Sequence, residues 1–443
     1  MELELTRAEA DEQSKVKHEM TELAGEALHR RDGYVAETAT LAAQKGQLNA
    51  EISALEDRLH DYRTKDIPDV ERAGRLRIPI IGQDQLVPTS KGEVDEQAFL
   101  ETLEAAIGKA GFNFDPRLLR AFHTSLKIAD AAPLTVLAGI SGTGKSELPR
   151  LYADLGGLPI LEIAIQPSWD SPHDLFGFYN YTDGRFKAEP LARLLYQMND
   201  TDNPLGQGPC IVLLDEMNLA RVEYYFSEML SKLEARRADK RARNDANRAS
   251  VSIDLGPGKS ESLYLDERIL FVGTMNNDES TMTLSDKVLD RASTITFPAP
   301  RDMKLTQAGE ITKATQRVSW STWQSWCRPP TEDENCAKLN KINDIMDDLG
   351  RPFGHRLFRA IHAYLANYPG DGQIHKENAW ADQMEMKIFP RLRGLECEAR
   401  GIKGHLEALK GQIPESRREA FDAARDGEFF AFNGARSSHM AKP

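Results

Sequence analysis

The sequence has few cysteines and no long apolar run. Its four cysteines are Cys210, Cys327, Cys336 and Cys397. They show neither CxxC spacing nor a nearby histidine pattern, which is typical of free thiols in a reducing compartment rather than of a zinc site or disulfides. No uncharged apolar run of about 18 residues is present, so no membrane span is expected. The acidic first residues lack the order of a secretory signal, and a cytoplasmic protein is therefore predicted.

Basic residues are outnumbered by acidic ones. Lys plus Arg total 56 and Asp plus Glu total 69, which gives a formal net charge of −13. This charge argues against non-specific wrapping of nucleic acid. One local basic run contains Lys232, Arg236, Arg237, Lys240, Arg241, Arg243 and Arg248. Two interpretations stay open: a solvated helix face with an intersubunit ion pair, which we favour, and contact with nucleic-acid phosphates.

Residues 1–65 contain no proline and carry an apolar heptad pattern. Tyr34, Leu41, Leu48, Leu55 and Tyr62 recur every seven residues, with Ile52 and Leu59 at the complementary position. This period predicts a helix that forms a coiled coil. Polar residues interrupt the apolar seam, and glycines interrupt the helix, so a single long helix packed on its own protein or on another subunit is the alternative.

The rest of the chain is predicted to form an α/β domain and a helical domain. Residues 66–109 form a linker and a helical entry, since prolines and glycines precede the first helical pattern. Residues 110–300 alternate β-rich runs with helical ones, which predicts a mostly parallel sheet covered by helices. The strand candidates are TVLAGI, PILEIAI, CIVLLDE, RILFVGTMN and STITF. An all-helical lid is expected over residues 301–411 and a charged tail over residues 412–443.

A glycine-rich loop follows the first strand candidate. From Gly139 to Ser146 it matches the phosphate-binding pattern GxxxxGK[ST], and the helical stretch ELPRLYADL follows it. The glycines allow successive backbone N–H groups to point at a β-phosphate. We expect Lys145 to bridge β- and γ-phosphate oxygens and the Ser146 hydroxyl to bind Mg²⁺. The sequence therefore predicts a nucleoside-triphosphate site.

Two adjacent acids end the apolar run CIVLLDE. The carboxyl ends of such buried parallel strands are where ligands bind in open α/β sheets. Asp215 is predicted to hold Mg²⁺ together with Ser146, and Glu216 to accept a proton from the attacking water. The residues predicted to bind the nucleotide and its metal are Gly139, Ser141, Gly142, Thr143, Gly144, Lys145, Ser146 and Asp215.

These motifs resemble those of the AAA+ superfamily, specifically its McrB-like and MoxR-like (dynein-related) branch, over roughly residues 110–410. The resemblance implies a P-loop parallel sheet flanked by helices, with an all-α lid. Asn276, at the end of RILFVGTMN, matches the sensor-1 residue. Arg291, before STITF, matches the arginine finger that acts on a neighbouring subunit. Arg356, in FGHR, matches the sensor-2 arginine of the lid. The alternatives are a strand-capping asparagine, a helix C-terminal cation and a surface arginine.

Two further segments resemble parts of this branch. Residues 166–179 contain turn signals flanked by aromatics, which predicts a short hairpin inserted into a helical region. Trp169 or Phe178 there is expected either to face the pore of a ring or to pack against the body. Residues 387–394, KIFPRLRG, resemble a recurring lid segment, and no chemistry is assigned to them.

The resemblance implies an oligomeric NTPase, since a finger supplied in trans requires a ring, and a hexamer is expected. ATP is preferred over GTP as substrate, with Mg²⁺ as cofactor. The branch suggests the NTPase subunit of a restriction or phage-defence system, acting with a separate nuclease subunit and leaving nucleic acid open as a partner. The alternatives are a MoxR-like remodelling chaperone and a nucleotide-switched scaffold that assembles through residues 1–65.

Overall fold

The computed structural model of the chain describes residues 2–64, 68–242, 249–276, 284–298, 309–330 and 334–432. Two compact units are present. The first comprises Met1–Asp69 with Tyr181–Gly184, and the second comprises Val70–Asn180 with Arg185–Pro443. Each unit is described separately below.

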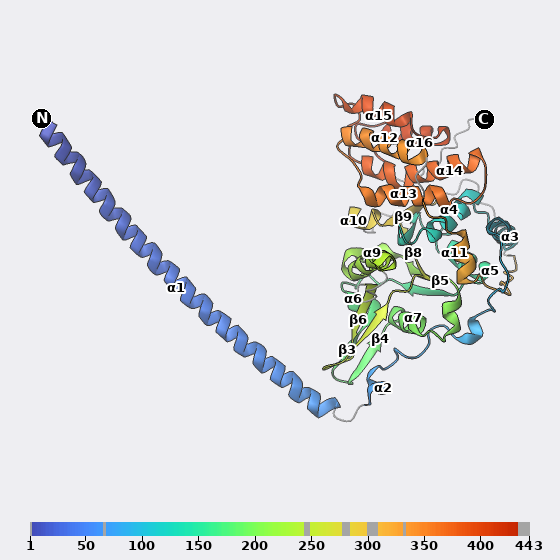
Figure 1. Cartoon of the computed structure of the whole chain (residues 1–443), viewed down its shortest axis with the longest axis horizontal. Helices are drawn as coiled ribbons and strands as arrows, with labels where there is room; N and C mark the ends of the chain where they lie inside the picture. The colour runs from blue at the N-terminus through green and yellow to red at the C-terminus, as the bar shows by residue number, and fades with distance from the viewer. Residues whose placement is uncertain are drawn as a thin grey trace. The chain divides into compact units, whose positions relative to one another are not determined.

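The first unit consists mainly of one helix, α1 (Glu2–Thr64), which spans 63 residues (Figure 1). The helix expected here is present, and the glycines at positions 33 and 46 do not end it. Its heptad side chains Tyr34, Leu41 and Leu48 are 57–68% exposed. The coiled-coil pairing of this helix stays a prediction.

The second unit contains a five-stranded parallel sheet with the order β2-β5-β8-β1-β9. All five strand candidates from the sequence are confirmed. Their bounds are β1 (Leu134–Gly139), β2 (Ile160–Ala164), β5 (Cys210–Asp215), β8 (Ile269–Asn276) and β9 (Ala292–Thr296). Because every pairing is parallel, the carboxyl ends of all five strands meet at one edge.

Helices cover both faces of this sheet. In β5, Val212 packs in one core cluster and Leu213 in another, since successive side chains point to opposite faces. The first cluster includes residues of α7 (Pro190–Asn199), α8 (Val222–Tyr225) and α9 (Ser227–Ala242). The second includes residues of α3 (Glu96–Lys109), α4 (Pro116–Lys127), α5 (Glu147–Gly156) and α11 (Trp320–Trp326). The predicted α/β fold is confirmed.

Two antiparallel hairpins stand outside the main sheet. The hairpin predicted near residue 178 is formed by β3 (Gly177–Asn180) and β4 (Arg185–Ala188). A second hairpin of β6 (Ser250–Asp254) and β7 (Ser260–Tyr264) was not predicted. Short helical turns complete the domain: α2 (Asp69–Arg72), η1 (Gln83–Gln85), α6 (Pro172–Phe176), η2 (Pro204–Gln207), η3 (Met217–Leu219) and α10 (Asp286–Leu289).

The C-terminal helices gather into a separate core, the lid (Figure 1). They are α12 (Glu334–Asp348), α13 (His355–Asn367), α14 (Gln373–Gln383), α15 (Ile402–Lys410) and α16 (Glu415–Arg425). Between α14 and α15 lie a π-helical turn, η5 (Met384–Ile388), and a 3₁₀ turn, η6 (Phe389–Leu392). The helical lid expected from the sequence is present.

Three predicted boundaries differ from the structure. The tail expected over residues 412–443 is wrong up to residue 432, because Phe421, Phe430 and Phe432 are buried in the lid core. Charged neighbours of these aromatics concealed this packing in the sequence. The linker expected after residue 66 packs against the α/β core through Leu76. Helix α11, expected in the lid, contributes Trp323 to the core cluster of the sheet.

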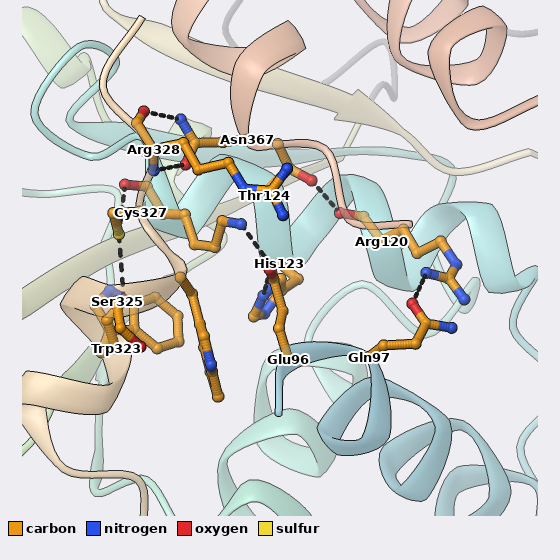
Figure 2. A network of polar contacts seen from close by, with 12 residues as sticks. Glu96, Gln97, Arg120, His123, Thr124, Trp323, Ser325, Cys327, Arg328 and Asn367 are labelled. Atoms are coloured by element: carbon orange, nitrogen blue, oxygen red, sulfur yellow. Dashed lines mark hydrogen bonds and ion pairs between the residues drawn. The ribbon is translucent and has the colours of Figure 1, made fainter. Parts of the chain in front are cut away.

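A buried polar network joins the helices on one face of the sheet (Figure 2). His123 of α4 lies 2.6 Å from the Tyr152 hydroxyl through Nδ1 and 3.0 Å from Glu96 Oε1 through Nε2. Lys127 also donates to Glu96. These contacts suit a neutral His123 that donates to Glu96 and accepts from Tyr152. The network therefore links α3, α4 and α5 through hydrogen bonds of Glu96, His123 and Tyr152.

Acidification is expected to destabilise the wild type more than His123→Gln. Burial lowers the pKa of His123 from 6.5 to about 4. As the pH falls below 6.5, the unfolded chain binds a proton at His123 that the folded chain excludes until about pH 4. The stability that is present above pH 6.5 is therefore lost. Between roughly pH 7.5 and pH 5.5 the loss is about 1 kcal/mol. Thermal midpoints at both pH values measure it, and equal shifts in the two proteins would contradict it.

Candidate nucleotide-binding and hydrolysis site

The phosphate loop connects the end of β1 to the start of α5. Gly142 and Gly144 have positive φ values of 77° and 86°, a backbone conformation that side-chain-bearing residues rarely adopt. A Cβ on Gly144 would also lie 3.0 Å from Phe114 Cε1. Both glycines are therefore needed for the loop to take this course.

Side chains of the loop turn back onto its own backbone. Lys145 is 6% exposed, and its Nζ donates to the Ile140 carbonyl at 2.6 Å. Thr143 Oγ1 donates to the same carbonyl at 3.0 Å. Ser141 lies in the turn between strand and helix. The ammonium is thereby held at the loop, where the predicted phosphate contact requires it.

Ser146 and Asp215 lie side by side, although 69 positions separate them in sequence. Ser146 Oγ donates to Asp215 Oδ1 at 2.6 Å, and Thr274 Oγ1 donates to the same oxygen at 2.7 Å. Ser146 immediately precedes α5, and Asp215 ends β5. The strand order places β8 between β5 and β1, which is why Thr274 joins the pair.

A hydroxyl beside a carboxylate is a donor set that suits Mg²⁺. This ion usually takes one or two protein oxygens and completes its shell with water and substrate phosphates. No larger group of histidine, cysteine and acidic side chains that would hold a metal by itself occurs in the part of the chain that the structure describes. Ser146 and Asp215 are thus suited to a metal brought by a nucleotide.

Glu216 has the left-handed backbone conformation, with φ 53°. No other residue besides glycine has a positive φ in the described ranges, and such strained positions are concentrated at functional sites. The Glu216 backbone N–H donates to Thr274 Oγ1 at 2.8 Å. Strand β5 thus ends at Asp215, and the backbone of Glu216 lies against Thr274 of β8.

Asn276 is the side-chain partner of Glu216. Its Nδ2 donates to Glu216 Oε1 at 3.2 Å. Asn218 holds Asn276 in place: Asn218 Nδ2 donates to the Asn276 carbonyl at 2.8 Å, and the Asn276 N–H donates to Asn218 Oδ1 at 3.3 Å. Sequence reasoning missed Asn218, whose only signal is its position two residues after Glu216. Register also pairs Asn276 with Gly139 of β1, next to the phosphate loop.

Arg291 and Arg356, the two arginines predicted to act on the nucleotide, both form ion pairs with one glutamate, Glu234. Sequence reasoning did not single out Glu234. Arg291 Nε lies 3.1 Å from Glu234 Oε1, and Arg356 Nη2 lies 2.8 Å from the same oxygen. Glu234 belongs to α9, whereas Arg356 belongs to the lid helix α13. Within one chain the arginines are therefore held by Glu234, and their roles toward a nucleotide stay predictions.

The predicted substrate-facing residues have mixed outcomes. Arg236 is 1% exposed and donates to the Asp266 carbonyl at 2.9 Å. For this residue both the favoured solvated helix face and the phosphate contact are wrong. Trp169 packs edge-on against Tyr225, with ring centroids 5.5 Å apart. Phe178 is 47% exposed on β3. The basic residues at positions 243 and 248 lie outside the described residues.

Comparison with known sequences addresses the domain that carries this site. The family described as AAA domain (dynein-related subfamily) matches residues 135–292. Residues 135–292 form an AAA+ domain. The matched range contains the phosphate loop, both acids, Asn276 and Arg291. AAA+ domains bind and hydrolyse nucleoside triphosphates, and the geometry of the polar residues agrees with that chemistry.

Other comparisons extend beyond the AAA+ domain. A family described only as a domain of unknown function, DUF8727, matches residues 311–429, which includes α16 with the lid. A crystal structure of a candidate ATPase from Cytophaga hutchinsonii is 15% identical, with 66% of this chain and 81% of that chain covered and a TM-score of 0.36. None of the curated proteins compared matches the chain. No described helix is long and apolar enough to cross a membrane.

Proposed function

We propose that this chain is a Mg²⁺-dependent ATPase that works as an oligomeric motor. The observation that carries the proposal is the contact between Ser146 Oγ and Asp215 Oδ1 at 2.6 Å, beside the Asn276–Glu216 pair. The two pairs lie at the same edge of the sheet, and we assign the first to the metal and the second to the orientation of water. ATP is chosen over GTP because ATP is the usual substrate of the superfamily, and parallel assays with both nucleotides test that choice.

In the proposed reaction each residue has a separate task. Lys145 and the loop N–H groups bind the β- and γ-phosphates, and Ser146 and Asp215 hold the metal. Mg²⁺, when bound, neutralises charge that develops on the phosphates. Glu216 orients the attacking water and accepts its proton, while Asn276 fixes the direction of the Glu216 carboxylate. The β–γ phosphoanhydride bond breaks and inorganic phosphate leaves.

The proposed assembly is a homo-oligomeric ring, a hexamer by resemblance. Arg291 reaches the γ-phosphate of a neighbouring subunit and offsets charge in the transition state. Arg356 responds to the same phosphate from the lid. Both arginines form ion pairs with Glu234. These pairs support a mechanism in which both arginines leave Glu234 when the phosphates of a bound nucleotide and a neighbouring subunit offer stronger partners.

Arg291→Ala subunits are expected to be inactive alone and active when mixed with Glu216→Gln subunits. An arginine finger contributes roughly 10³–10⁵ in rate, so the single variant loses most turnover. In a mixed ring, a Glu216→Gln subunit supplies Arg291 to the intact site of its neighbour. Phosphate release from titrated mixtures measures the recovery. Mixtures as inactive as the separate variants would show that Arg291 does not act between subunits.

The biological role that we propose is that of an McrB-like NTPase subunit in a restriction or phage-defence system. Such a subunit requires a separate nuclease, and nucleic acid is its expected polymer. Affinity purification of the Glu216→Gln protein with bound ATP tests this role, because slowed turnover retains partners. Recovery of a nuclease or nucleic acid supports it, whereas recovery of client proteins alone favours a MoxR-like remodelling chaperone.

A nucleotide-switched scaffold is the second candidate, favoured by the exposed heptad side chains of α1. It predicts tight ATP binding without turnover, and assembly that depends on residues 1–65. Light scattering with and without ATP, combined with a phosphate-release assay, separates the two functions. Sustained turnover by the purified chain excludes the scaffold.

A further inference from the structure

A lysine of the lid brackets the turn that carries Arg291. Lys387 lies in the π-helical turn η5, and its Nζ donates to the Leu289 carbonyl at 3.2 Å and to the Ala292 carbonyl. Leu289 ends α10 and Ala292 begins β9. Only Asp290 and Arg291 lie between these two carbonyls. One ammonium therefore fixes both ends of the turn.

An arginine from the next turn of the lid holds the same segment by its side chain. Arg391, in the 3₁₀ turn η6, forms an ion pair with Asp290. Asp290 is the immediate neighbour of Arg291. Lys387 and Arg391 belong to the segment KIFPR, so a single short piece of the lid determines both the backbone course and one side chain of the turn.

The chemistry of Lys387 is unusual for a residue that only fills space. Its side chain is buried, with the residue 4% exposed, and its bonding partners are carbonyls rather than a carboxylate. Burial lowers the pKa of Lys387 to about 8. An apolar side chain would fill the same volume without the desolvation cost of a charge, but it would not direct two carbonyls. π-Helical turns are rare and frequently occur at functional sites.

We propose that Lys387, assisted by Arg391, is a positioning residue that sets how Arg291 is presented to the neighbouring subunit. Movement of the lid then reaches Arg291 through the bracketed turn. This inference rests on the proposed function, in which Arg291 acts on a neighbour's nucleotide. The ion pair between Glu234 and the lid residue Arg356 ties the Arg291 guanidinium to the same lid.

Steady-state turnover and nucleotide affinity of full-length Lys387→Met and Arg391→Ala test the role. A displaced arginine lowers kcat, and a shift of about 1 Å in such a group costs roughly 100-fold. We expect kcat to fall by roughly 10–100-fold, with the Kd for a fluorescent ATP analogue unchanged within about twofold. The control Lys410→Met removes a lid lysine that binds Asp422 within the lid, and it should leave both values unchanged. Wild-type kcat in Lys387→Met overturns the proposal.

A double-mutant cycle separates this inference from the proposed function. If Arg291→Ala alone leaves kcat unchanged, the finger itself is wrong. If Arg291→Ala lowers kcat and Lys387→Met then lowers it further by its full factor, the two residues act independently and the positioning role is overturned. The expected result is no additional loss. Should Lys387→Met fail to fold, the milder Asp290→Asn, at a side chain 39% exposed, weakens the Arg391 contact and should show the same non-additivity.

Discussion

Glu216→Gln protein should bind ATP as tightly as the wild type and release phosphate at a rate lower by roughly 10²–10⁴. Glutamine keeps the size of the side chain and its hydrogen bond with Asn276 Nδ2 through the amide oxygen. It cannot accept a proton from water, so the step that generates the nucleophile is lost. Ser146 and Asp215 are untouched, so the phosphate and metal contacts should persist.

Single-turnover phosphate release and equilibrium binding of a fluorescent ATP analogue measure the two effects separately. Glu228→Gln is the matched control, because Glu228 lies in the first turn of α9 and has no role in the proposed reaction. It should behave as the wild type. Turnover by Glu216→Gln at the wild-type rate would remove Glu216 from the reaction.

Lys145→Ala should bind nucleotide at least roughly 10-fold more weakly than the wild type. The Lys145 ammonium is buried in the phosphate loop and is its single ammonium group. A charge-assisted hydrogen bond is worth about 1.5–3 kcal/mol, so loss of this contact alone weakens binding by roughly 10–150-fold. The loop geometry depends on Gly142 and Gly144, which the substitution leaves in place.

Isothermal titration with Mg-ATP measures the affinity of the variant. Lys109→Ala, at the exposed end of α3, is the control for loss of a positive charge and should bind as the wild type does. Equal affinities of Lys145→Ala and the wild type would show that the glycine-rich turn is not a phosphate site.

The sheet and the core of the site were accessible from the sequence because local patterns encode them. The loop from Gly139 to Ser146 has a rigid spacing requirement, and CIVLLDE combines a buried strand with two acids at its end. Parallel strands bring their carboxyl ends to one edge, so the proximity of Ser146 and Asp215 follows from fold class alone. The observed contact at 2.6 Å agrees with that reasoning.

The parts that the sequence did not reveal depend on contacts between distant segments. Glu234 is one acid in a charge-rich helix, and nothing local indicates that Arg291 and Arg356 share it. Lys387 donates to backbone carbonyls, and because every residue has a carbonyl, the sequence does not indicate these partners. The buried Phe421 lies among charged residues that suggested an exposed tail. In each case tertiary packing gives the residue an environment that differs from the one its neighbours in sequence suggest.

The central claim is that Ser146, Asp215 and Glu216 form one site around the terminal phosphate of a nucleotide held by Lys145. A crystal structure of the Glu216→Gln protein with Mn²⁺ and ATP tests it most directly, because an anomalous difference map locates Mn²⁺. The account predicts one Mn²⁺ peak at about 2 Å from Ser146 Oγ, on the Asp215 side, in contact with the β- and γ-phosphates. A nucleotide bound at the loop with its metal remote from Ser146 and Asp215 would contradict it.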